Sequence, residues 1–137
     1  MILDCPRALY ITTFSGALDQ VITNLTMNAL HHGFSENTGG TIIIEVSEQV
    51  DDNLRVKFSD NGCGIPIENR GKIFDPFFTT RRNEGGTGLG LNILFNLVTH
   101  KMRGTVNLSD EQLSQTIFEI MLPKDIEQLE ANEDIAQ

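Results

Sequence analysis

Residues 85–91, with the sequence GGTGLGL, open directly into a stretch whose apolar spacing predicts a helix over residues 89–102. Glycine weakens the start of a helix unless its conformational freedom or its missing side chain is used. Here several backbone N–H groups converge with the positive end of a helix, which is an anion site that needs no basic side chain. The segment therefore predicts a phosphate site, and a flexible hinge is the alternative.

This segment belongs to neither of two common phosphate-binding motifs. It is not a P-loop, because no Gly-Lys-Ser/Thr follows the glycines. It is not a dinucleotide-binding fingerprint either, because a proline-bearing loop leads into it where that motif requires a strand. Another nucleotide-binding architecture is therefore expected.

The rest of the sequence predicts further helices and strands on both sides of this segment. Helical spacing of apolar residues, or proline in a first turn, marks helices, and β-rich or alternating runs mark strands. The expected helices are 16–32, 66–72 and 89–102, and the expected strands are 8–13, 41–46, 54–59, 104–108 and 116–122. The acidic tail, 124–137, is expected to be a frayed helix or disordered.

Composition limits the classes of partner and compartment. The chain has 137 residues, the length of one domain, and a net charge of −9, which argues against nucleic acid and anionic membranes as partners. Two isolated cysteines suit a reducing compartment, and no apolar run reaches the roughly 18–20 residues of a membrane span. The fragment is expected to be cytoplasmic and not membrane-inserted, and a parent anchored in the inner membrane is compatible with it.

Four polar side chains follow one stripe of the first expected helix. Gln20, Asn24, Asn28 and His31 are separated by four, four and three residues. A solvated face is the alternative, but asparagine is unfavourable inside helices because its amide competes for backbone hydrogen bonds. An asparagine oxygen is a suitable ligand for Mg²⁺ that phosphates already hold.

Two further segments carry candidate binding residues. The turn DNGCG (60–64) follows the strand 54–59, where Asp60 can accept a hydrogen bond from an exocyclic amine, although a plain turn would also explain this sequence. In IFDPFF (73–78), Phe77 and Phe78 cannot both point inward from a regular strand. One of these rings is expected to anchor the base of a lid.

Taken together, these segments resemble the four boxes of the GHKL ATPases, and within that superfamily the bacterial sensor histidine kinases. The resemblance covers residues 8–123, with QVITNLTMNALHH similar to the N box, DNGCGIP to the G1 box, IFDPFFTT to the F box and GGTGLGL to the G2 box. Each box is weak alone, but four in this order are specific. The resemblance implies an α/β two-layer sandwich, the Bergerat fold, with helices packed on one face of a mixed β-sheet, and the expected element order agrees.

By position, the resemblance implies binding of ATP and Mg²⁺. Asp60 would bind the adenine amino group, Gly62 and Gly64 would shape that wall, and Thr116 would support Asp60. The residues expected to contact the nucleotide are Asn28, His31, Asp60, Gly62, Gly64, Ile65, Phe77, Gly86, Thr87, Gly88, Leu89, Gly90 and Thr116.

The resemblance also implies a catalytic set. Asn28 would ligate Mg²⁺, Asn24 would lie beside the phosphates, and Arg81 and Arg82 would reach the γ-phosphate. His31 departs from the family, which often has lysine there, so its contact with phosphate requires a protonated ring or one N–H donor.

Asn24 separates kinases from hydrolases. In GHKL members that hydrolyse ATP, and in the related serine kinases, a glutamate stands at this position, and an amide cannot act as a general base. The resemblance therefore implies the ATP-binding catalytic domain of a two-component sensor histidine kinase, which transfers the γ-phosphate to a histidine in a separate dimerisation segment. The alternatives are a nucleotide-binding module without activity, or another GHKL ATPase or serine kinase.

The expected domain organisation has one ATP-binding domain over residues 1–123 and the tail 124–137. The family's first helix and its upstream hairpin with the acceptor histidine are expected to be missing. His31, His32 and His100 lie on expected elements of the ATP domain, so none is expected to be the acceptor. The implied partners are this hairpin and a response regulator, in a homodimeric parent, with no nucleic acid.

Overall fold

The computed structural model describes residues 1–4, 10–33, 39–78, 89–109 and 115–136. Its elements are strands and helices, and a π-helical turn directly follows each of the α-helices α1 and α3. In chain order they are β1 (Ile2–Asp4), α1 (Ser15–Asn28), η1 (Ala29–Gly33), β2 (Ile42–Gln49), β3 (Asn53–Asp60), α2 (Ile67–Arg70), α3 (Gly90–Asn96), η3 (Leu97–Lys101), β4 (Thr105–Leu108), β5 (Thr116–Pro123) and α4 (Ile126–Ala136).

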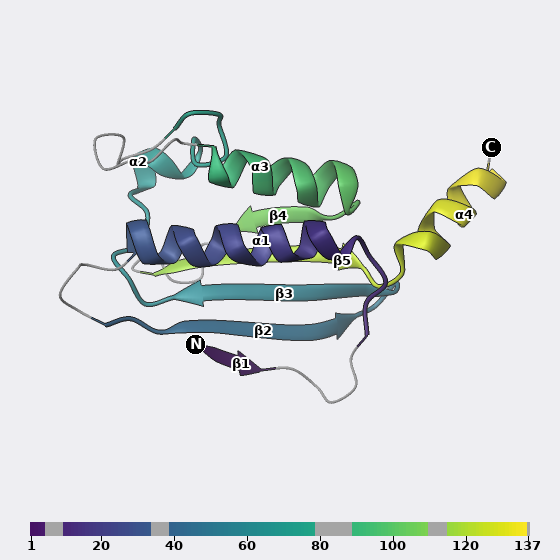
Figure 1. Ribbon diagram of the computed structural model, residues 1–137, viewed down its shortest axis with the longest axis horizontal. Coiled ribbons are helices and arrows are strands. Elements are labelled where there is room, and N and C mark those ends of the chain that lie inside the picture. The colour runs from purple at the N-terminus through teal and green to yellow at the C-terminus, as the bar shows by residue number, and fades with distance from the viewer. Residues whose placement is uncertain (5–9, 34–38, 79–88, 110–114, 137) are drawn as a thin grey trace.

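The strands form one mixed sheet in the order β1-β2-β3-β5-β4 (Figure 1). β1 pairs parallel with β2, and the other three pairings are antiparallel. Asp51 and Asp52, with φ of 65° and 56°, make the tight turn between β2 and β3. Aspartate tolerates this left-handed conformation better than most residues, which is why a polar turn can join these strands.

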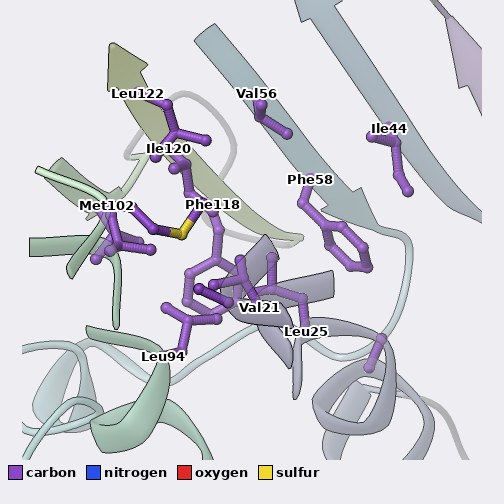
Figure 2. Close-up of a cluster of buried hydrophobic side chains, with 14 of the residues drawn as sticks. Val21, Leu25, Ile44, Val56, Phe58, Leu94, Met102, Phe118, Ile120 and Leu122 are labelled. Atoms are coloured by element: carbon purple, nitrogen blue, oxygen red, sulfur yellow. The ribbon is translucent and has the colours of Figure 1, made fainter. Parts of the chain in front are cut away.

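The core lies between one face of the sheet and the helices α1 and α3. In β3, Leu54, Val56 and Phe58 are buried, and the intervening Arg55 and Lys57 are half-buried on the other face. Figure 2 shows side chains of β3 and β5 pointing toward those of α1 and α3, where Phe58 and Phe118 meet the aliphatic side chains of the helices. The predicted α/β sandwich with helices on one face is therefore confirmed.

One predicted strand is wrong in its described part. Residues 10–13 form no extended strand; Thr12 instead makes a single bridge with Asp125. Its N–H donates to Lys124 O at 2.9 Å, and its carbonyl accepts from Ile126 N at 3.0 Å. The first strand of the sheet lies earlier, at Ile2–Asp4, so the apolar residues near position 11 do not mark a sheet strand.

The acidic C-terminal segment is a helix, one of the two expected forms. Asp125 accepts a hydrogen bond from Gln128 N at 3.1 Å and so satisfies one N–H of the first turn of α4. Ile126 is buried, whereas α4 then projects away from the sheet, where Glu133 pairs with Arg103 (Figure 1). None of the helices in the described ranges combines the length and apolar character needed to cross a bilayer.

The turn after η3 requires a glycine. Gly104 N donates to Val98 O at 2.7 Å, and the preceding Arg103 has φ of 61°. This places Gly104 so close to β5 that an added Cβ would lie 2.1 Å from Met121 O and 2.9 Å from Leu122 Cδ2. One of these atoms belongs to the backbone of a central strand and cannot move without disturbing the sheet.

We expect Gly104→Ala to lower the free energy of unfolding by about 3 kcal/mol, because the methyl group overpacks this contact. Gly16→Ala is the matched control, since nothing lies within 4 Å of an added Cβ at this helical position. The control should be neutral or stabilising by up to about 1 kcal/mol. Urea unfolding followed by circular dichroism measures both, and equal effects of the two substitutions would contradict the close approach.

Candidate functional site

Two polar residues are buried next to each other at one end of the sheet. Asp60 is the last residue of β3, Thr116 is the first of β5, and the two are register partners with 3% exposure each. Among the residues that the structure describes, these two are the polar side chains that are buried. Burial raises the pKa of the Asp60 carboxyl above its ordinary value, and a hydrogen bond from the N–H of Gly62 opposes this rise. Burying a carboxylate lowers stability, which makes Asp60 a candidate binding residue.

The turn after β3 shapes the backbone beside Asp60. Gly62 N donates to Asp60 Oδ1 at 2.9 Å, and Gly64 has φ of 74°, a conformation that favours glycine. Asn61 closes the turn against the start of β2, because its N–H donates to Thr41 O at 3.2 Å and its Oδ1 accepts from Thr41 N at 2.7 Å. Hydrogen bonds therefore hold the turn both to the end of β3 and to the residue before β2.

The polar stripe of α1 contacts the start of α3. Asn24 and Asn28 are half-buried, whereas His31 lies exposed on η1. Gln20 Nε2 donates to Asn24 Oδ1 at 2.8 Å, and Asn24 Nδ2 donates to Gly90 O at 3.0 Å. In Figure 1 the end of α1, the start of α3 and the end of β3 lie at the same end of the molecule.

The phenylalanine rings of the segment before residue 79 differ in burial. Phe74 packs with its ring centroid 5.4 Å from that of Phe95 and 6.1 Å from that of Phe118. Phe78 packs against the core, whereas Phe77 is 61% exposed with φ of 66°. One of the two consecutive rings therefore points inward and the other outward, as predicted.

Five of the predicted binding and catalytic residues lie outside the described residues. Residues 79–88 hold Arg81, Arg82, Gly86, Thr87 and Gly88, so their expected contacts stay predictions.

Three further predicted nucleotide-contacting residues fall at the start of α3 and beside the turn after β3. Leu89 is half-buried directly before α3, Gly90 is the first residue of α3, and Ile65 is half-buried against the core. These three positions therefore lie next to Asn24 and to the turn after Asp60.

The polar groups of the described site fit an adenine nucleotide with a divalent cation. Asp60 supplies a buried acceptor for an amino group, and the Asn28 amide offers one neutral oxygen of the kind that Mg²⁺ accepts. Among the described residues, no group of three or more His, Cys, Asp or Glu side chains could hold a metal ion.

Sequence reasoning missed two long-range hydrogen bonds at this site. The stripe spacing signalled that Gln20 and Asn24 share a face, but nothing local indicated Gly90 as the partner of Asn24. Likewise Asn92 Nδ2 donates to Phe74 O at 3.0 Å, which ties α3 to the aromatic segment. Each bond joins residues that only the folded chain brings together.

Comparison with known proteins gives one family. Residues 15–126 match the model of histidine kinase-, DNA gyrase B- and HSP90-like ATPases. Sporulation kinase A of Bacillus subtilis is 35% identical over 117 residues, which cover 85% of this chain and 18% of that kinase. The chain thus spans less than a fifth of the length of this relative.

Solved structures share the fold. The catalytic domain of histidine kinase ThkA superposes with a TM-score of 0.73 at 31% identity, covering 91% of this chain and 81% of that domain. The complex of ThkA with response regulator protein TrrA gives a TM-score of 0.70 at 26% identity, covering 90% of this chain and 33% of that chain.

We expect Asp60→Asn to raise the free energy of unfolding at pH 7. Because burial raises the folded pKa of Asp60, wild-type stability falls as pH rises from the ordinary carboxyl value, about 4, through the folded value. The amide removes this loss and keeps an oxygen that accepts from Gly62 N. The gain should shrink as the pH falls and be nearly absent at about pH 3, where the wild-type carboxyl is mostly protonated in both states.

Urea unfolding at both pH values measures this difference, with the exposed Asp19→Asn as the matched control. A gain of the same size at about pH 3 and at pH 7, or a loss of stability at pH 7, would contradict the raised pKa of Asp60.

Proposed function

Because this chain belongs to the family of histidine kinase-, DNA gyrase B- and HSP90-like ATPases, we propose that it binds Mg·ATP and transfers the γ-phosphate to a histidine in a separate segment of its parent protein. The histidine kinases among its relatives support this choice within the family. We take residues 1–123 as the proposed ATP-binding unit, with α4 as its C-terminal extension.

The observation that carries the proposal is the buried carboxyl of Asp60 beside Thr116. In our proposal Asp60 accepts a hydrogen bond from the 6-amino group of adenine. Thr116 holds the carboxyl from the neighbouring strand, and the turn at Gly62 and Gly64 forms the wall beside the base. A base without an amino donor at this position would leave the carboxylate buried and without a partner from the ligand, which costs binding energy.

The amides of α1 would serve the phosphates. Asn28 would hold Mg²⁺ through its oxygen, and the bound cation would neutralise charge on the phosphate oxygens. Asn24 would donate an N–H beside the phosphates, and Arg81 and Arg82 would reach the γ-phosphate as charged donors. The predicted backbone N–H donors at Gly86 and Gly88 complete this set.

Asn24 also favours transfer over hydrolysis. Its side chain has no carboxylate, so it cannot take a proton from water. An imidazole nucleophile needs little activation, and in-line geometry together with charge neutralisation would supply the rate. The domain would therefore transfer phosphate only when another segment places the acceptor histidine at the site.

We propose two protein partners for this domain. One is the dimerisation segment of a homodimeric parent, which would carry the acceptor histidine. The other is a response regulator, for which the complex of ThkA with response regulator protein TrrA is support. We propose that the domain acts in the cytoplasm, where ATP is available.

We expect radiolabelled ATP to label an acceptor segment of the same parent when this chain is added, and to leave the chain alone unlabelled. Asn28→Ala should reduce the labelling by at least about 100-fold, because the metal ligand is lost. Asn132→Ala, an exposed amide on α4, is the matched control and should keep wild-type labelling. The product should be an acid-labile, base-stable phosphohistidine.

Labelling of the chain by itself that survives replacement of His31, His32 and His100 would overturn the proposal. Nucleotide binding with a normal fold, but no transfer to the acceptor segment, would instead indicate a binding module without kinase activity.

A further inference from the structure

One backbone carbonyl fixes the orientation of two side-chain amides on α1. Gly90 O can only accept a hydrogen bond, and Asn24 Nδ2 lies 3.0 Å from it. Asn24 must therefore turn its NH₂ group toward α3. Its Oδ1 then lies on the side of Gln20, whose Nε2 is 2.8 Å away and must donate.

This directional chain limits what the Asn24 side chain can do. Its oxygen accepts from Gln20, and one of its N–H groups donates to Gly90 O, so its second N–H is available as a donor, whereas any further contact to its oxygen must lie beside the Gln20 amide. Asn28 lies one turn further along the same face of α1. Asn24 therefore presents an N–H donor at this place on α1.

We propose that Gln20 is a positioning residue of the nucleotide site. Its amide donates to Asn24 Oδ1 and so holds Asn24 as a hydrogen-bond donor, which leaves the role of cation ligand to Asn28. The inference rests on the proposed function, because it assigns the two asparagines to phosphate and metal. Gln20 itself is exposed and acts through Asn24.

A structural role for Gln20 makes a different prediction. An exposed amide pair four residues apart on a helix stabilises that helix by only about 0.2–0.5 kcal/mol. If Gln20 acted by shape or helix propensity, Gln20→Glu would be the mildest substitution, because the two side chains have the same shape and similar propensity. If Gln20 acts by donating a hydrogen bond, Gln20→Glu should be the most damaging substitution. The ionised Glu carboxylate can only accept, and it would face Asn24 Oδ1, which is also an acceptor.

The test is the affinity for Mg·ATP and Mg·ADP by calorimetry. Gln20→Glu is made together with Asp19→Asn, so that the net charge is unchanged. We expect this pair to weaken Mg·ATP binding about threefold to tenfold, and Gln20→Met to weaken it less. Asp19→Asn alone should stay within about twofold of wild type. Affinity of the charge-balanced pair equal to wild type would overturn the inference.

A double-mutant cycle separates positioning from a general loss of structure. In an Asn24→Ala background, Gln20→Met should have no further effect on Mg·ATP affinity, because its only target is gone. Additive effects of the two substitutions would overturn the inference and leave the proposed function intact.

If wild type binds neither nucleotide, the proposed function fails, and the positioning role fails with it. The hydrogen-bond chain itself is then tested separately by the NMR signals of the Asn24 side-chain NH₂ in the nucleotide-free protein. We expect these signals to shift in Gln20→Met and to stay in place in Asp19→Asn. Unchanged signals in Gln20→Met would show that the chain of amides is not formed.

Discussion

The antiparallel register between β3 and β5 is the constraint on which the site depends. It places Phe58 opposite Phe118, Val56 opposite Ile120, and Asp60 opposite Thr116, all on the face that the helices cover. Because side chains alternate between faces, a slip of one residue would expose the apolar pairs and move the carboxyl to the other face. The packing of the core therefore fixes the position of Asp60.

The helices add the second half of the site to this frame. α1 packs its apolar side on the sheet through Val21 and Leu25, and the same orientation turns Asn24 toward the start of α3. Asn92 then ties α3 to Phe74 at the other side of residues 79–88. Hydrogen bonds from asparagine amides thus hold both segments that flank this stretch, and the core of the domain positions them.

Sequence reasoning recovered what local chemistry encodes. Alternation in 54–59 predicted the buried face of β3, and the steps of four in α1 predicted the stripe that joins Gln20 to Asn24. It failed where a distant segment decides the structure. Thr12 pairs with Asp125 and not within the sheet, and Gly104 is required because its backbone lies against Met121 of β5. Nothing within a short window of sequence contains these partners.

The central claim is that the buried carboxyl of Asp60 recognises the amino group of the nucleotide base. The most direct measurement compares the affinity of the wild-type chain for ATP with that for purine riboside triphosphate, which lacks only the 6-amino group. The account predicts that ATP binds about tenfold or more tightly, because the analogue leaves a buried charged acceptor without its donor. Equal affinity for the two nucleotides would contradict it.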